Sequence, residues 1–126
     1  MRKTSSTNFH NQAYLEEKCA LNELIYLLSK RWITEVLFSI EEGNNRFSSL
    51  KEDLRFISDN ILADRLKLLE QHKLINRNEH FNETPARVEY TLTATGYSLS
   101  ELLGGMCDFA EKNMVFPSRA QASLNG

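Results

Sequence analysis

Between residues 19 and 70 the apolar side chains recur every three or four positions, which is the period of a helix with one buried face. The first run predicts a core-facing helix whose apolar positions are Leu21, Leu24, Ile25 and Leu28. A second run begins at Ile33 and predicts a helix that ends near Glu42, because a glycine and two asparagines follow and tolerate left-handed backbone. Two helices are therefore expected in this first part of the chain.

Two further helices are predicted close together. Phe47, Leu50 and Leu54 have the spacing of a helix of two turns. A longer helix follows, because Ser58 is a favourable N-cap and Asp59 suits the positive end of a helix dipole. Its apolar stripe consists of Leu62, Leu66 and Leu69. Only a few residues separate the pair, so a tight turn must join them.

From Ile75 the apolar period changes to two, which indicates strands. In the second strand Val88, Tyr90 and Leu92 fall on one face, and Arg87 falls on the other. The two strands are joined by the short loop NETPA. A β-hairpin is therefore expected.

A last helix is expected after the hairpin, capped by Thr93 or Thr95. It carries more apolar surface than a small domain easily covers, which often marks an oligomer interface, although burial against its own domain is the alternative. The positions assigned to a dimer interface are Leu99, Leu102, Leu103, Met106 and Phe109. Cys107 lies on the apolar side of this helix and is expected in the core.

Two helices joined by a tight turn and followed at once by a hairpin are typical of a winged helix-turn-helix. The fold class is therefore α+β and mainly α, a winged helix-turn-helix with a further helix at each end. In this arrangement the second helix of the pair lies in the DNA major groove, and the hairpin lies along the backbone or enters the minor groove.

The outward face of the second helix supplies the candidate DNA-reading residues: Ser58, Asp59, Asn60, Ala63, Asp64, Arg65 and Lys67. Asn60 could pair with an adenine edge, a carboxylate could accept from cytosine, and Lys67 or Arg65 could neutralise a phosphate. Taken alone, such a polar face is more often plain solvated surface, and Asp59 and Asp64 would repel phosphates. Only the position of this helix directly before the hairpin favours DNA contact over plain solvated surface.

The candidate wing and backbone contacts are Arg46, Arg77, Asn82, Thr84, Pro85 and Arg87. Pro85 fixes its own φ and pushes Thr84 towards extended geometry, which stiffens the loop of the hairpin. Arg87 leaves this loop on the polar face, where it either reaches a phosphate or pairs with an acid of the hairpin. We expect the phosphate contact.

Composition and charge narrow the function classes. A chain of 126 residues fits one domain, and its net charge is −2, although residues 46–77 alone carry +2. That asymmetry is a mild hint of where a polyanion could dock. No apolar run approaches the length of a membrane span, so a cytoplasmic protein without a membrane partner is expected.

Catalytic and metal chemistry find little support in the sequence. His10, His72 and His80 have no ligand spacing to each other or to the two cysteines, so neither a metal site nor another cofactor is expected. There is no phosphate-binding glycine loop, nucleophile elbow or paired-carboxylate motif. We therefore do not expect an enzyme.

The residues 19–117 resemble the HxlR family of bacterial transcriptional regulators, which is MarR-like. The sequence motifs of the family fall on several parts of this chain. Cys19 precedes the first helix, Arg31-Trp32 opens the second, and Arg46-Phe47 with Leu50 leads into the third. The recognition helix matches at Ile57-Ser58 with Leu62, Arg65-Leu66 and Leu69-Glu70, and the wing matches at Pro85, Arg87 to Thr93 and Gly96. Lys73 replaces a usual glycine, so its helix must end without glycine's ease in a left-handed conformation. Residues 1–18 are then an N-terminal extension, and residues 118–126 a flexible tail.

The resemblance implies a homodimer that binds an inverted repeat in double-stranded DNA, with the first and last helices as its dimer surface. It also implies a candidate redox sensor at Cys19, because some such regulators sense oxidants or electrophiles there. Lys18 and the helix start favour the thiolate. The alternative is a small buried residue without redox work.

Two functions from different classes remain open. The first is a sequence-specific regulator, and repression is expected because so small a chain has no extra domain to recruit polymerase. An oxidant or a small molecule would be its effector. The second is a winged-helix module that binds another protein and no DNA. Clustering of Arg65, Lys67, Arg77 and Arg87 would favour the first.

Overall fold

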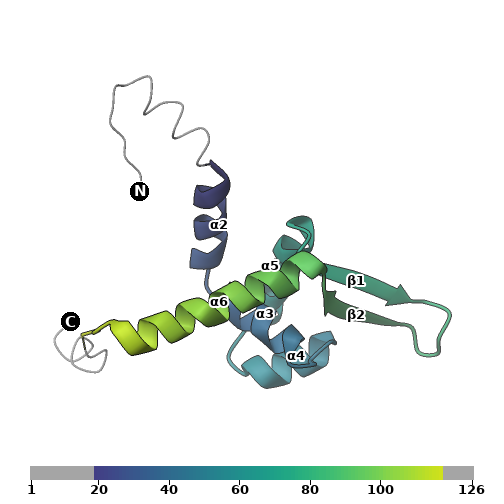
Figure 1. The fold of residues 1–126 in the computed structure, drawn as a ribbon. Coiled ribbons are helices and arrows are strands. Elements are labelled where there is room, and N and C mark those ends of the chain that lie inside the picture. Colours follow the sequence, from purple (N-terminus) through teal and green to yellow (C-terminus); the bar gives the residue numbers. More distant parts are fainter. Residues whose placement is uncertain (1–18, 118–126) are drawn as a thin grey trace.

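The computed structural model describes residues 19–117, which form five helices and one two-stranded antiparallel sheet (Figure 1). In chain order these are α2 (Cys19–Ser29), α3 (Ile33–Glu41), α4 (Phe47–Leu54), α5 (Asp59–Gln71), β1 (Ile75–His80), β2 (Arg87–Leu92) and α6 (Ala94–Asn113). The predicted order of elements and the winged helix-turn-helix fold are confirmed. The extension 1–18 and the tail 118–126 lie outside the described residues. Within the described part, no helix is long and apolar enough to cross a membrane.

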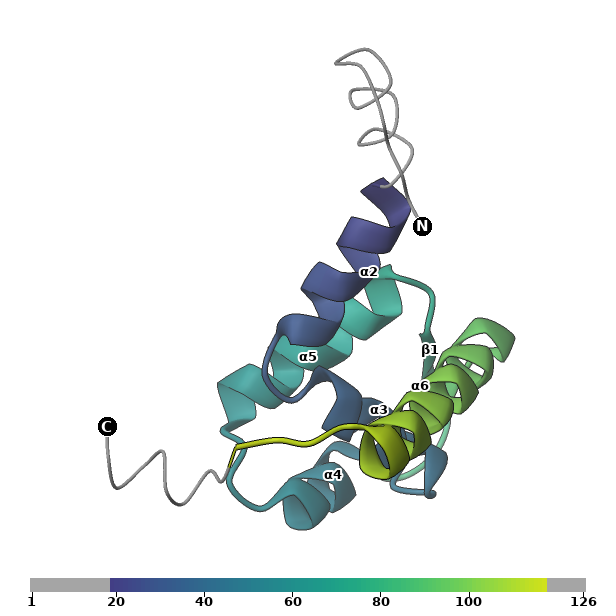
Figure 2. The same ribbon diagram turned by 60° about the vertical axis from the view of Figure 1, so that its left-hand side comes forward.

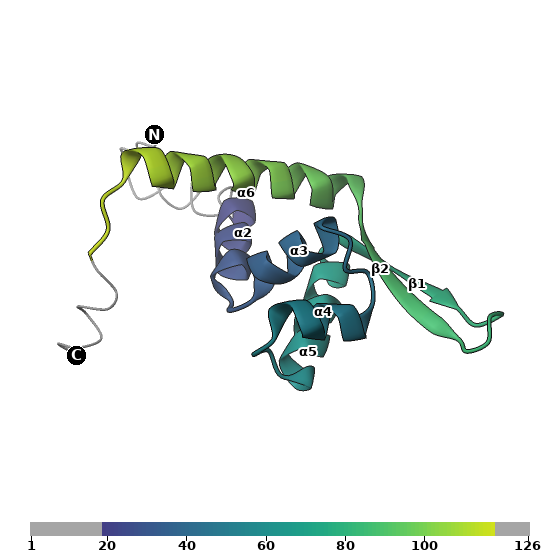
Figure 3. The same ribbon diagram turned by 90° about the horizontal axis from the view of Figure 1, so that it is seen from below.

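Helix α3 is the centre of the domain. It packs against α2, α4, α5, α6 and β2. In Figure 3, α6 crosses one side of the domain, α4 and α5 lie on the other side, and α3 lies between them. Its spacing of three and four is confirmed, since its buried apolar residues are Ile33, Val36, Leu37 and Ile40. The core therefore sits between the α4–α5 pair and α6.

Helix α5 begins and ends as its sequence predicts. The Ser58 hydroxyl accepts a hydrogen bond from the backbone N–H of Ile61 at 3.1 Å, which satisfies one free donor of the first turn. The inward stripe of Leu62, Leu66 and Leu69 is buried. At the other end Lys73 has a φ of 62°, the left-handed conformation that glycine adopts more readily. The chain therefore turns directly from α5 into β1.

The hairpin is attached to the domain at its base and projects from it at its tip (Figure 1). The strands pair from Ile75 with Leu92 to His80 with Arg87. The backbone N–H of Tyr90 donates to the carbonyl of Asn45 at 2.8 Å, which ties β2 to the loop between α3 and α4. The tip contains a cis Thr84–Pro85 bond.

Helix α6 has a buried half and an exposed half. Its start is capped by the Thr93 hydroxyl, and its first half buries Leu99 and Leu103 and bonds Ser100 to Glu41 of α3. Towards its C-terminal end the helix extends past the rest of the domain (Figure 3). The large apolar residues exposed on α6 are Tyr97, Leu102, Met106 and Phe109, each more than half accessible.

The burial of the two terminal helices corrects three expectations from the sequence. Leu99 and Leu103, assigned to a dimer surface, belong to the core of their own chain. Cys107, expected in the core, is exposed because it follows the last buried turn of α6. The apolar face predicted for α2 is only partly covered, since Leu21 and Ile25 are exposed.

The start of α6 meets the end of α5 at one backbone group. The carbonyl of Leu74 accepts a hydrogen bond from the N–H of Thr93 at 3.0 Å. A Cβ placed on Gly96 would lie 2.1 Å from the same oxygen, far inside van der Waals contact. Only glycine therefore allows α6 to approach this point so closely.

We predict that Gly96→Ala lowers the free energy of unfolding by about 1–3 kcal/mol, because the backbone must shift to admit the methyl group. Urea denaturation measures the difference. Gly104→Ala is the matched control, since a Cβ there meets no atom within 4 Å. The control should gain about 0.4–1 kcal/mol from the reduced entropy of the unfolded chain. A Gly96→Ala variant as stable as the wild type would contradict the close packing.

Candidate nucleic-acid interface

The N-terminus of α5 is held by a lysine of α4. The ammonium of Lys51 donates to the carbonyl of Ile57 at 2.7 Å and pairs with the Asp59 carboxylate at 3.0 Å. These two contacts join α4, the turn and the first residue of α5. Three quarters of the Asp59 side chain stays accessible, so the carboxylate is oriented but still reachable. The turn therefore presents the start of α5 in a defined position.

Most residues predicted on the outward face of α5 are exposed, and they are Ser58, Asp59, Asn60, Ala63, Asp64 and Lys67. Arg65 is different, because it is half-buried. Its Nε donates to the backbone carbonyl of Arg31 at 2.7 Å, and its guanidinium pairs with Asp64 at 2.5 Å. Arg65 thus joins α5 to the turn before α3, and its charge is already balanced by a carboxylate.

The arginines of the hairpin are also paired with carboxylates. Arg87 pairs with Glu83 of the loop and, through Nε at 3.2 Å, with Glu89 of its own strand. Arg77 pairs with Glu79. Of the two alternatives for Arg87, the structure therefore shows pairing with acids. A phosphate would have to replace these carboxylates.

A histidine completes this acidic cluster. His80 lies 3.6 Å from Glu83 and 3.2 Å from Glu89, measured between ring nitrogen and carboxylate oxygen. Partial burial raises the pKa of the Glu89 carboxyl, but the hydrogen bond and charge of Arg87, followed by those of His80, outweigh it. The pKa of Glu89 consequently lies below its ordinary value. Glu89 is therefore firmly ionised beside Arg87.

The other predicted backbone contacts are accessible. Asn82, Thr84 and Pro85 are exposed at the tip of the hairpin, and Arg46 is exposed at the start of α4. Between the hairpin and α5 lies a cavity of about 340 Å³, lined by Phe47, Ala63, Leu66, Lys67, Glu70, Arg77 and Tyr90. Arg77 and Lys67 thus lie on opposite sides of one depression, while Arg87 and Arg65 do not line it.

Reasoning from the sequence missed Lys30 and Arg31. They form the turn before α3, and a second cavity of about 390 Å³ lies between this turn and α5. Its lining is Lys30, Asp64, Lys67, Leu68 and Gln71. The signal was present in the sequence, since two basic residues, Lys30 and Arg31, directly precede Trp32.

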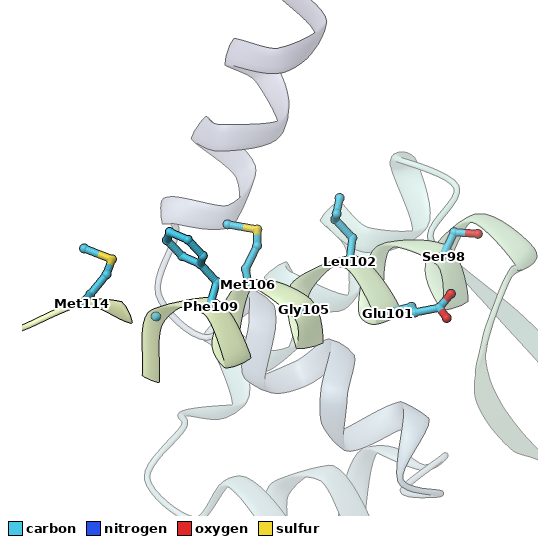
Figure 4. Close-up of a pocket in the computed structure, with 8 residues that line it drawn as sticks. Ser98, Glu101, Leu102, Gly105, Met106, Phe109 and Met114 are labelled. Carbon is cyan, nitrogen blue, oxygen red and sulfur yellow. The ribbon is translucent and has the colours of Figure 1, made fainter. Parts of the chain in front are cut away.

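An open apolar groove runs along α6, away from α5. Its volume is about 700 Å³, and its lining is Ser98, Glu101, Leu102, Gly105, Met106, Phe109, Ala110 and Met114. In Figure 4 the side chains of Leu102, Met106 and Phe109 point from the same side of the helix. Three of the five residues predicted at a dimer interface are thus together on one surface.

The described residues offer no candidate metal centre, because no three His, Cys, Asp or Glu side chains among them could hold an ion together. Cys19 is the first residue of α2, and its side chain lies outside the described residues.

Comparison with known proteins decides the family. The model of the HxlR-like helix-turn-helix matches residues 27–116, which include α3 to α6. The chain belongs to the HxlR family. Its relatives are helix-turn-helix transcriptional regulators and not enzymes.

Among these HxlR relatives, the HTH-type transcriptional regulator YtfH of Escherichia coli K12 is 34% identical over 98 residues, covering 78% of this chain and 77% of YtfH. The reduced form of the regulator YodB from Bacillus subtilis superposes with a TM-score of 0.70 at 34% identity, covering 75% of this chain and 92% of YodB. A MarR-family regulator from Enterococcus faecalis gives 0.69 at 30% identity, with coverages of 86% and 93%. The two solved structures share the fold of this chain.

Proposed function

We propose that this HxlR protein is a sequence-specific transcriptional regulator that binds an inverted-repeat operator as a homodimer. One observation carries the proposal. Lys51 fixes the start of a helix whose outward face is polar and accessible, directly beside a hairpin. Such a helix fits the major groove of DNA. Repression is the mode of regulation that we include in this proposal.

Asn60 and Asp59 are the candidate base-reading residues. Both are exposed in the first turn of α5, the part of a recognition helix that usually meets base edges. An asparagine pairs with two atoms of adenine, and a carboxylate accepts from the amino group of cytosine. Asp59 repels phosphates less than its charge suggests, because the Lys51 ammonium lies beside it.

We predict that the wild-type chain selects preferred duplexes from a randomised pool, and that its affinity falls steeply with salt as counterions are released. Asn60→Ala should cost about 1–3 kcal/mol on a selected duplex and much less on a random one. Fluorescence anisotropy with labelled duplexes measures both, and Asn22→Ala on α2 is the matched control. Absence of binding to every duplex at low salt would favour the protein-interaction module instead.

The exposed apolar residues support a homodimer. Leu102, Met106 and Phe109 line the groove of α6, and Leu21 and Ile25 are exposed on α2. Apolar surface of this kind on two helices is costly in water and is typical of an interface between subunits. The groove is lined by α6, and α6 lies on the opposite side of α3 from α5 (Figure 3), so a partner on α6 would leave the outward face of α5 open.

We predict that Met106→Glu shifts the protein from dimer to monomer, because a carboxylate would be buried without a partner. Light scattering after size exclusion measures the mass at several concentrations. Phe56→Glu is the control, since Phe56 is exposed in the turn between α4 and α5. A wild-type chain that stays monomeric at high concentration would contradict the dimer.

An oxidant or electrophile is the proposed effector, acting through Cys19. The support comes from the relative YodB of Bacillus subtilis, which has been solved in a diamide-treated and a quinone-bound form. The aligned parts of these two structures are 33% and 30% identical to this chain, respectively. Cys19 begins α2, one of the two helices with exposed apolar residues. A modification there would act on the same helix that supports the dimer.

We predict that diamide or a quinone releases the wild-type chain from its selected duplex and that Cys19→Ser abolishes this release. Anisotropy before and after treatment, with reversal by a thiol for diamide, measures it. Cys107→Ser separates the contribution of the exposed cysteine of α6. If Cys19→Ser is released as readily as the wild type, Cys19 is a structural residue.

A further inference from the structure

We propose that the turn between α2 and α3 is a second DNA-backbone contact, in which Lys30 and Arg31 bind phosphates beside the recognition helix. This inference rests on the proposed DNA binding. The sequence suggests Arg87 of the hairpin as the phosphate contact. We infer that the turn contributes more to phosphate binding than Arg87 does.

The turn is fixed against α5. The carbonyl of Arg31 accepts the hydrogen bond from Arg65 at 2.7 Å, so its backbone lies beside the middle of the helix. Figure 2 shows the end of α2 and this turn alongside α5. Lys30 and Lys67 line the same cavity of about 390 Å³. A strand of DNA backbone that borders the groove occupied by α5 would therefore meet the turn.

The two cations of the turn are held in place without being neutralised. The ammonium of Lys30 lies 4.9 Å from the centre of the Tyr26 ring, and the guanidinium of Arg31 lies 5.0 Å from that of Trp32. Such contacts orient a cation but leave its charge. Among residues 19–117 neither of them pairs with a carboxylate. Both charges remain available to a phosphate.

Local charge distinguishes the turn from the hairpin. Around the turn stand four basic residues, Lys30, Arg31, Arg65 and Lys67, and two acidic residues, Glu35 and Asp64, which gives +2. The acids are partly occupied, because Glu35 accepts from Thr34 and Asp64 pairs with Arg65. The hairpin carries Arg77 and Arg87 against Glu79, Glu83 and Glu89, which gives −1 with His80 neutral. A polyanion is therefore attracted to the turn more than to the hairpin.

The positions of the two cavities agree with this assignment. Lys67 lines both of them, with the hairpin beyond one and the turn beyond the other. The exposed face of α5 is thus bordered on two sides. A helix in the major groove has a phosphate strand on each side, so the turn and the hairpin would each face one of these strands.

The test compares three charge-removing variants, Lys30→Met, Arg31→Met and Arg87→Met, with Lys112→Met as the control near the end of α6. Methionine keeps an apolar stem over Tyr26 and Trp32. Anisotropy with a random-sequence duplex and with a selected duplex is followed over a series of KCl concentrations. The slope of log K against log salt is negative. Each turn variant should make it less steep by about 0.9 per lost contact, or about 1.8 per dimer.

The expected loss is equal on both duplexes, because phosphate contacts carry no sequence information. Lys30→Arg should restore the slope, and thermal unfolding should show that each variant is folded. The inference would be overturned if the turn variants kept the slope and affinity of Lys112→Met, or if Arg87→Met lost more DNA affinity than they do. The proposed function would stand in both cases. A folded wild-type chain that binds no duplex would overturn both.

Discussion

The backbone carbonyl of Leu74 joins α5, the hairpin and α6. It lies where α5 ends and β1 begins, it accepts the N–H of Thr93, and Gly96 of α6 packs directly on it. The hydroxyl of Thr93 also donates to the neighbouring carbonyl of Lys73 at 2.7 Å. Helix α5, the hairpin and α6 therefore meet at one point, so a displacement of one of them there would disturb the other two.

The local elements could be predicted well from the sequence, because their signals are local. The stripe of Leu62, Leu66 and Leu69, the cap at Ser58 and the alternation of β2 each depend on neighbours within a few positions. Even the left-handed Lys73 was foreseeable from the family pattern. These features needed no knowledge of how distant segments meet.

The site was less predictable, because burial and charge pairing depend on distant residues. Periodicity shows that one side of α6 is apolar but not where the supporting domain ends, so Leu103 and Cys107 were assigned to the wrong surroundings. The same applies to Arg87, whose charge is satisfied by Glu83 and Glu89 only once the hairpin forms. Only the fold brings the turn at Lys30 beside the residues of α5 that line the same cavity, 34 positions or more further along the chain.

The division of α6 has a consequence for the operator. Its first half is locked to α3 by Leu99, Leu103 and the bond from Ser100 to Glu41, so its second half leaves the domain in a set direction. In a dimer joined along that second half, the length of α6 would set the distance and the relative orientation of the two α5 helices. Each residue of the helix adds about 1.5 Å of length and about 100° of rotation. Under the proposed function, the length and direction of α6 would set the spacing of the half-sites, and α5 would read the bases within each half-site.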